Sequence, residues 1–550
     1  MSNRLPSGQS SDKPDASEPR TLIDELLAEQ RELTAVETFS RAHDAHAIAA
    51  PRYRDLLPLT APASGQQYAF EVDLDKCSGC KACVTACHSL NGLDEDETWR
   101  SVGQLASTDW RAPLKQTVTT ACHHCVDPAC LNGCPVLAYD KDPVTGIVRH
   151  LDDQCIGCQY CVMMCPYEVP QYLPKRGIVR KCDMCSSRLA AGEAPACVQA
   201  CPNEAIRITV VDQANVRGKY RQLEAFNFQP SNFDSAPNRF LPDSPNPAIT
   251  LPTTRYLSQR PLPAGLEAAD THELRLAKAH PPLTLMLVLS QLGVGLAVAN
   301  LAASASRLTA LTAVIITVVG VAAGTLHLGQ PLKAWRSFLG WRKSWLSREL
   351  IVFGGFMAAL GAHAILLRPL SAILAAATGL AAVACSAMVY VDTRRPFWSA
   401  PMTFGKFFGT TLLLGAAGTL FLSLLSPDPA PPPAASMLLL MAGVAIKAAA
   451  ENRVFRYLVD EQSPQLTALN KTALLLDGPL GRLSRLRVMC AVVGGIGLPM
   501  LTIIGGHVGA PSAVALATVA LSLCFAGELI ERHLFFVAEV APKMPGAGVA

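Results

Sequence analysis

Sixteen of the nineteen cysteines lie between Cys77 and Cys201, and this clustering constrains the fold more than any other feature of the chain. They form four groups of four: Cys77, Cys80, Cys83 and Cys87; Cys122, Cys125, Cys130 and Cys134; Cys155, Cys158, Cys161 and Cys165; Cys182, Cys185, Cys197 and Cys201. Two-residue gaps let three thiolates hold one iron-sulfur cubane, while the fourth, followed by proline in three groups, ligates another cluster. The four groups predict four [4Fe-4S] clusters in two ferredoxin-like modules.

Two other uses of paired cysteines fit the spacing less well. Structural zinc takes four thiolates per ion and gives no reason for a third cysteine after a CxxC pair and a fourth before proline. Disulfides suit an oxidising compartment, and no secretory signal precedes the first group. We therefore expect the cysteines to be iron ligands in a reducing compartment.

Hydropathy divides the chain into two halves. The mean hydropathy is +0.26 and only 17% of residues are charged, which is too apolar for a purely soluble protein. The apolar excess lies almost entirely after residue 280, so a polar, cysteine-rich half precedes an apolar half. The net charge of +3 is too small to indicate a nucleic-acid partner.

The cysteine groups and the apolar second half together predict an α+β double ferredoxin-like iron-sulfur domain fused to an all-α polytopic membrane domain. Alternating segments such as QYAFEVDL and GIVRHL predict short strands in the first of these. Leu22, Leu26 and Leu33 fall at helical intervals in a predicted helix from Thr21 to about Asp44. The predicted regions are a tail and amphipathic helix (1–65), the four-cluster domain (66–210), a proline-rich extended linker (211–280) and the membrane anchor (281–550).

About eight apolar stretches in the second half are long enough, or nearly so, to cross a bilayer as helices. Their approximate spans are 283–303, 309–328, 349–367, 371–391, 404–425, 436–450, 488–505 and 511–532. The sixth is short. Abundant glycine and alanine fit helices that pack closely in lipid.

Basic residues predict how this domain is oriented. Nearly all lysines and arginines that flank the spans fall on the side of the cluster domain, whereas Arg307 and Arg368 fall on the other. The residues assigned to loops or helix ends on the cluster side include Lys406, Lys447, Arg487 and Arg532. The positive-inside rule therefore places the iron-sulfur domain on the cytoplasmic side of a bacterial inner membrane.

The segment CIGCQYCVMMCPYEVPQYLPKRGIVRKCDMCSSRLAAGEAPACVQACPNEAI resembles the four-cluster electron-transfer subunit of the dimethyl sulfoxide reductase family of molybdoenzymes. LHLGQPLKAWRSFLGWRKSWLSREL (326–350) and AGELIERHLFF (526–536) resemble the membrane anchor subunit of the same family. The resemblance covers about residues 68–540. It implies that two subunits, commonly separate in the family, are fused here.

The resemblance also implies which cysteines share a cluster. The implied sets are Cys77, Cys80, Cys83 and Cys201; Cys182, Cys185, Cys197 and Cys87; Cys122, Cys125, Cys130 and Cys165; Cys155, Cys158, Cys161 and Cys134. Some relatives replace one cysteine and hold a three-iron cluster. Because this chain keeps all sixteen, we expect four cubanes.

The family's quinol-linked histidine and glutamate match His327 and Glu349. Both lie near the cluster-side ends of predicted spans, where an ionisable pair is costly unless it has a function, and quinol oxidation needs groups that accept protons. The structural alternative is that His327 hydrogen-bonds a carbonyl and Glu349 caps a helix. With the resemblance, we expect a site for menaquinol or ubiquinol.

Other polar groups in the apolar half have simpler interpretations. His363 and Glu528 lie within spans, where each is expected to pair with a neighbouring helix. His280, His507 and His533 fall near span ends, so we expect no haem. Cys385, Cys490 and Cys524 are expected to be small buried apolar residues.

These features predict an electron-transfer subunit and not the terminal catalyst. Electrons would pass between the membrane quinone pool and a separate molybdopterin-containing subunit that reduces dimethyl sulfoxide or another S- or N-oxide. The main alternative is the reverse flow, in which a cytoplasmic sulfite dehydrogenase delivers electrons to quinone. A cluster-bearing sensor or assembly scaffold is the alternative from another class, although it would not need so many clusters and spans.

Overall fold

The computed structural model describes residues 22, 25, 55–58, 60–107, 113–224, 240–263, 265–302, 306–425, 433–459, 466–504 and 510–546. The chain divides into two compact units, residues 1–55 and residues 56–550. In the first unit, Leu22 and Glu25 are helical. The rest of the helix predicted from Thr21 to Asp44 lies outside the described residues.

One antiparallel strand pair joins the beginning and the end of the cysteine-rich half. Strand β1 (Gln66–Asp73) pairs with β8 (Ile206–Asp212), with Phe70 opposite Ile208. Both of these side chains are buried. Since β1 ends just before Cys77 and β8 begins just after Cys201, this ladder brings the first and the last cysteine of the sequence groups to the same end of the sheet.

A second sheet and two hairpins complete the strands of this half. The remaining strands are β2 (Ser101–Ser107), β3 (Lys115–Thr120), β4 (Tyr139–Lys141), β5 (Val148–His150), β6 (Gln171–Leu173), β7 (Ile178–Arg180), β9 (Arg255–Leu257) and β10 (Leu266–Ala268). The sheets have the orders β8-β1-β9 and β10-β2-β3, and β4-β5 and β6-β7 are antiparallel hairpins.

Short helices carry or flank the later cysteines of each group. They are α4 (Ala82–Leu90), α5 (Ala129–Gly133), α6 (Tyr160–Met164), α7 (Ser186–Ala190) and α8 (Ala196–Gln199). Positive φ angles at Gly79 (74°), Lys81 (62°), Gly157 (68°) and Gln159 (60°) turn the first and third cysteine loops before α4 and α6 begin. This left-handed backbone gives the tight turn that closely spaced ligands require.

The proline-rich linker is more ordered than its composition predicts. It begins with helix α9 (Gln213–Glu224). Further on, β9 adds to β1 in parallel and β10 adds to β2 in antiparallel orientation. The linker therefore supplies an edge strand to each three-stranded sheet and pairs backbone groups that would otherwise be exposed at those edges.

The second half is helical. Its helices are α10 (Pro281–Ala302), α11 (Arg307–Thr325), α12 (Trp345–Leu366), α13 (Pro369–Val391), α14 (Ala400–Leu425), α15 (Pro433–Asn452), α16 (Ala468–Asp477), α17 (Gly481–Val492), α18 (Leu498–Ile504) and α19 (Ala510–Val537). A short π-helical segment joins α17 to α18. Among the described residues, seven helical stretches are long and apolar enough to span a membrane. Helix α15, at the predicted sixth span, is a further long helix outside those seven.

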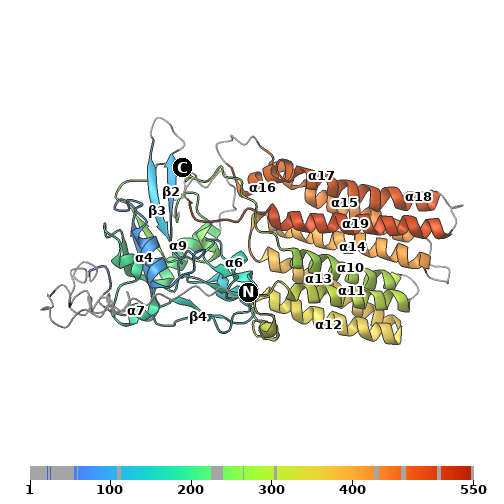
Figure 1. Ribbon diagram of the computed structural model, residues 1–550, viewed down its shortest axis with the longest axis horizontal. Coiled ribbons are helices and arrows are strands. Elements are labelled where there is room, and N and C mark those ends of the chain that lie inside the picture. The colour runs from blue at the N-terminus through green and yellow to red at the C-terminus, as the bar shows by residue number, and fades with distance from the viewer. Residues whose placement is uncertain are drawn as a thin grey trace, which may run out of the picture. The chain divides into compact units, whose positions relative to one another are not determined.

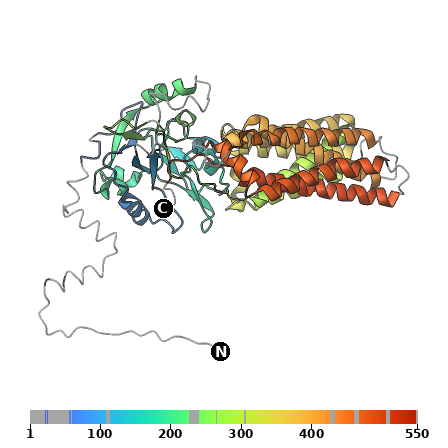
Figure 2. The same ribbon diagram turned by 90° about the horizontal axis from the view of Figure 1, so that it is seen from above.

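The long helices lie side by side in two groups, α10 to α13 and α14 to α19 (Figures 1 and 2). Helices α10 and α14 join the groups through a close backbone approach. A Cβ added at Gly295 would lie 2.3 Å from the Thr411 carbonyl oxygen, and one added at Gly415 would lie 2.6 Å from the Gly295 backbone. Only glycine fits at this crossing, as expected for helices packed through small residues.

Candidate functional site

The sixteen cysteines gather into four sets, each drawing three members from one sequence group and one from another. Quartet A is Cys77, Cys80, Cys83 and Cys201, which line one pocket. Quartet B is Cys122, Cys125, Cys130 and Cys165, which line another. Quartet C is Cys155, Cys158, Cys161 and Cys134, and quartet D is Cys182, Cys185, Cys197 and Cys87, each set joined by mutual electrostatic contact.

The donor chemistry of the quartets fits iron-sulfur clusters. Burial raises the pKa of the Cys87 thiol to about 12 and that of Cys165 to about 11. Buried thiols such as these ionise at neutral pH only beside positive charge. Among the described residues, no three Cys, His, Asp or Glu side chains converge closely enough to hold a single metal ion. The arrangement suits a group larger than one zinc ion.

Two buried cations lie between quartets, and sequence analysis missed both. Arg100 is 2% exposed and lies within electrostatic reach of Cys83 in quartet A and Cys197 in quartet D. The ammonium of Lys181 donates to the Cys182 carbonyl at 2.9 Å and lies 3.6 Å from the Cys122 sulfur, so it lies between quartets D and B. Each cation offsets negative charge that thiolate-ligated clusters would carry.

The quartets form a series that ends at the helical half. Arg100 and Lys181 mark the A–D and D–B boundaries, and Cys130 of quartet B shares a buried core with Cys134, Cys155 and Cys161 of quartet C. The loop of quartet C then contacts the helices. Tyr160 donates its hydroxyl hydrogen to the Val389 carbonyl of α13 at 3.0 Å.

His327 lies just beyond α11, against the loop of quartet C. The side-chain amide of Gln159 is 3.5 Å from the His327 ring, which also hydrogen-bonds the Cys158 backbone. Burial, with Lys278 nearby, lowers the pKa of His327 to about 4, so its imidazole is neutral at pH 7. The ring of His280 packs edge-on at 5.0 Å.

Glu349 lies in α12 on the other side of the same loop. It is 4% exposed, lies beside Ser386 of α13 and is within electrostatic reach of Tyr160. The capping alternative does not fit, because Ser344 is the N-cap of α12 and the first turn has no acidic residue. Among the described residues, no hydrogen bond or ion pair is found between Glu349 and His327. Instead, the Cys158–Tyr160 segment contacts His327 and lies within electrostatic reach of Glu349.

Backbone contacts hold the two halves together around this segment. Gln330 donates its N–H to the Ile156 carbonyl at 3.0 Å, and Gly340 donates to the Pro135 carbonyl at 2.8 Å. The Ser344 hydroxyl donates to the Gly133 carbonyl at 2.7 Å. The connection between α11 and α12 therefore packs against the loop of quartet C.

Comparisons with known proteins agree with this arrangement. Residues 115–211 match the family described as 4Fe-4S dicluster domain, and residues 282–537 match DMSO reductase anchor subunit (DmsC). The chain is 36% identical over 200 residues to an anaerobic dimethyl sulfoxide reductase chain of Escherichia coli (strain K12), covering 35% of this chain and 96% of the relative. Its similarity to the probable anaerobic dimethyl sulfoxide reductase chain YnfG of the same strain has the same extent.

The chain belongs to the dimethyl sulfoxide reductase family. It combines the family's iron-sulfur subunit and its membrane anchor in one polypeptide, which confirms the predicted fusion. A further relative is the thiosulfate reductase electron transfer subunit PhsB of Salmonella typhi, which is 36% identical over 166 residues, or 30% of this chain and 86% of the relative.

Membership of this family defines the general role of the chain. It is a membrane-anchored electron-transfer subunit of a molybdoenzyme, with iron-sulfur clusters and a catalytic partner in a membrane complex. The match to the anchor family and the apolar helices show a multi-pass membrane protein.

Four basic residues assigned from sequence to loops or helix ends are instead buried in this anchor. The exposed fractions of the Lys406, Lys447, Arg487 and Arg532 side chains are 6%, 5%, 13% and 0%. Each lies on a helix and faces a carboxylate of the same bundle. Sequence analysis failed here because hydropathy places a charge near a helix end without showing which neighbour it faces. The predicted pairing of Glu528 with another helix is confirmed by its contact with Lys447.

Proposed function

We propose that this chain oxidises a membrane quinol beside His327 and Glu349 and passes the electrons through four [4Fe-4S] clusters to a molybdopterin-containing subunit. The observation that carries the proposal is the position of the Cys158–Tyr160 segment, which contacts His327 and α13 and lies within electrostatic reach of Glu349. A quinol that donates electrons beside His327 and Glu349 therefore lies next to quartet C.

Quartets A to D would hold the clusters, whose chemistry when bound is reversible one-electron transfer. Three cysteines from one sequence group and one cysteine from another surround each cluster position, and the fold fixes the spacing of the four sulfur atoms. Arg100 and Lys181 stabilise the negative charge at the boundaries between quartets. Buried aromatic and aliphatic residues surround most of these thiolates, whereas Cys80 of quartet A is exposed.

At the quinol site, the residues of the anchor handle protons. Oxidation of a quinol to a quinone releases two electrons and two protons. Glu349, buried beside Ser386, accepts one proton at a carboxylate oxygen, and the neutral His327 ring accepts the other from the second quinol hydroxyl. Gln159 and the Cys158 backbone hold the His327 ring in place.

The relatives support the direction and the class of substrate. Two are named as dimethyl sulfoxide reductase chains and one as a thiosulfate reductase subunit, so all three serve reductases. We infer that the partner reduces an S- or N-oxide, and that the quinol is menaquinol or ubiquinol. The excess of basic residues on the cluster side supports a bacterial inner-membrane location with the iron-sulfur half in the cytoplasm.

The test is reduction of the clusters by a quinol in the purified complex. We expect about sixteen irons per chain from four cubanes and bleaching of their visible absorbance on addition of menadiol. Glu349→Gln should slow bleaching about 100-fold, since general acid-base groups contribute factors of this order. Reduction by dithionite and the EPR spectra should not change.

The matched control is Glu539→Gln, which removes a buried carboxylate paired with Arg395 outside the quinol site. Eight irons or fewer would contradict the four-cluster proposal. Wild-type complex that menadiol does not reduce, and whose reduced clusters a quinone analogue does not reoxidise, would contradict the quinol site. Reoxidation alone would instead favour the reverse direction of flow.

A further inference from the structure

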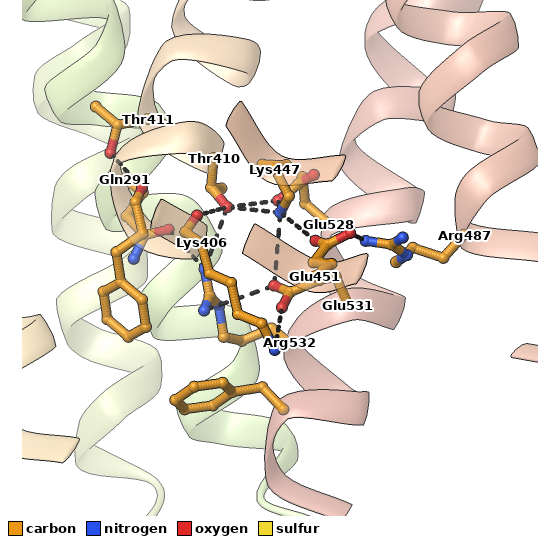
Figure 3. Close-up of polar contacts among 12 residues, drawn as sticks. Gln291, Lys406, Thr410, Thr411, Lys447, Glu451, Arg487, Glu528, Glu531 and Arg532 are labelled. Atoms are coloured by element: carbon orange, nitrogen blue, oxygen red, sulfur yellow. Dashed lines mark hydrogen bonds and ion pairs between the residues drawn. The ribbon is translucent and has the colours of Figure 1, made fainter. Parts of the chain in front are cut away.

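A second set of buried ionisable residues lies among the helices of the anchor (Figure 3). Its members come from four helices, and Gln291 of α10 borders them. They are Lys406 of α14, Lys447 and Glu451 of α15, Arg487 of α17, and Glu528, Glu531 and Arg532 of α19. We call these seven residues the charged network. Ionisable groups buried at membrane depth are costly and commonly functional.

Hydrogen bonds connect the network through one hydroxyl group. Thr410 donates to the Glu528 carboxylate at 2.5 Å, and its oxygen accepts from Lys447 at 3.0 Å and from Arg532 at 3.1 Å. Lys447 also contacts the Glu528 carboxylate directly. Arg532 also donates to the Gln291 side-chain carbonyl at 3.1 Å, so a polar chain runs from α10 through α19 and α14 to α15.

Ion pairs extend the network on both sides of this hydroxyl. Glu531 lies 3.5 Å from each of three cations, Lys406, Lys447 and Arg532. Both of its carboxylate oxygens lack a hydrogen-bond partner among the described residues. These oxygens therefore keep the capacity to accept a proton or a further hydrogen bond.

The network holds an odd number of charges. Its four cations face three carboxylates, so full ionisation leaves one uncompensated positive charge in a low-dielectric interior. Loss of one proton from a lysine restores neutrality. The network therefore has two states that differ by one proton, as a relay group requires.

Ionisable residues continue from the network toward one end of these helices only. Beyond it, residues 407–425 of α14, 433–446 of α15 and 510–527 of α19 contain no Asp, Glu, Lys, Arg or His. In the other direction, Glu451 lies one residue before the end of α15 and pairs with Arg487 of α17. This end lies toward the iron-sulfur half, because Arg395, just before α14, donates to the Met163 carbonyl.

Tyr390 links the network to the quinol site. It is 3% exposed and lies within electrostatic reach of both Glu349 and Arg532. Its ring packs edge-on against Phe535 at 5.1 Å, and the Arg532 guanidinium lies 5.4 Å from the centre of the same Phe535 ring.

We propose that Tyr390 and the charged network form a proton exit path, which carries protons from Glu349 to the aqueous surface on the cluster side. This inference rests on the proposed quinol oxidation. One quinol gives one quinone, two protons and two electrons, and two oxidised [4Fe-4S] clusters accept one electron each. The proton that Glu349 accepts passes by way of Tyr390 to the network and leaves at Glu451, whereas the second proton leaves from the half-buried His327.

The experiment is stopped-flow oxidation of menadiol by the purified complex in liposomes, with a pH indicator outside. Two variants test the path, Glu531→Gln in the network and Tyr390→Phe, which keeps the aromatic ring and removes only the hydroxyl. We expect cluster bleaching to slow about tenfold in both, with a larger solvent isotope effect in D2O. Proton appearance should lag behind bleaching in the variants but not in the wild type.

Glu539→Gln is the matched control and should bleach at the wild-type rate, while dithionite should reduce all variants fully. Wild-type rates in both test variants would overturn the proposal, and so would slow bleaching with an unchanged isotope effect or equal slowing in Glu539→Gln. If Glu531→Gln does not assemble, Tyr390→Phe decides. Failure of the quinol proposal is distinguishable, because menadiol would then not reduce the wild type either.

Discussion

At the scale of single residues, three glycines set how closely the quartet C loop approaches the anchor. Added Cβ atoms at Gly157 and Gly329 would lie 2.3 Å and 2.1 Å from the Gly177 carbonyl oxygen. Gly157 and Gly177 also have positive φ angles, 68° and 65°. The loop beside His327 therefore contacts the cysteine domain backbone to backbone, and a methyl group would separate the two surfaces.

We predict that Gly329→Ala slows menadiol reduction of the clusters at least tenfold while each half still folds. The added methyl displaces backbone, which cannot yield as a flexible side chain can. Gly354→Ala is the control, because no atom lies within 4 Å of its added Cβ. Equal rates for the two variants would show that this contact does not position the quinol site.

At the scale of elements, the segment after α19 returns to the cysteine-rich half. Its Lys543 pairs with the buried carboxylate of Asp270, and Gly546 donates to the same carboxylate at 3.1 Å. The Gly546 carbonyl accepts from Gln104 of β2 at 3.1 Å, and Met544 is buried in the core. Linker and tail therefore meet at one residue, Asp270.

We predict that Asp270→Asn releases the tail at neutral pH, at a cost of about 1–3 kcal/mol for the lost charged hydrogen bonds. Burial raises the pKa of Asp270, but Lys543 and Gly546 outweigh it and hold the pKa below the usual 3.8. In the wild type the attachment is therefore complete above pH 3.8 and is lost as the pH falls through the lowered pKa.

Limited proteolysis measures this release. Cleavage between 538 and 546 should be faster in Asp270→Asn than in the wild type at pH 7, and the difference should disappear in strong acid. A surface replacement such as Asp153→Asn, outside the tail contacts, serves as the control. Equal cleavage rates at pH 7 would show that Asp270 does not hold the tail.

At the scale of the whole molecule, the contacts at the two ends of the anchor determine the parity of its crossings. The chain enters α10 directly from the linker, and the tail beyond α19 contacts the same cysteine-rich half. Both ends therefore lie on one side, which requires an even number of crossings. Seven helical stretches qualify by length and hydropathy among the described residues, so we infer that α15 is the eighth.

A reporter fused after Ala550 should therefore give the same location as the iron-sulfur half, and we predict the cytoplasm. A green fluorescent fusion should fluoresce, and an alkaline phosphatase fusion should be inactive. Fusion within residues 426–430, between α14 and α15, should give the opposite location. Opposite locations for the end of the chain and the iron-sulfur half would contradict the eight-crossing topology.

Local spacing determined much of this protein. The sequence alone predicted the cysteine groups and the apolar spans, because ligand loops and membrane helices depend on residues close together in the chain. It also showed that His327 and Glu349 match a family pattern. The same reasoning did not predict the linker strands β9 and β10, because they form only where β1 and β2 leave backbone groups unpaired.

Only the tertiary structure decided which side chains meet across helices. It placed Arg100 and Lys181 between quartets and the Cys158–Tyr160 segment between His327 and Glu349. It also showed that four basic residues expected in loops or at helix ends belong to a buried network. They are Lys406, Lys447, Arg487 and Arg532. The physical reason is that hydropathy records how much of a helix is apolar, whereas the free energy of a buried charge depends on the partner that faces it.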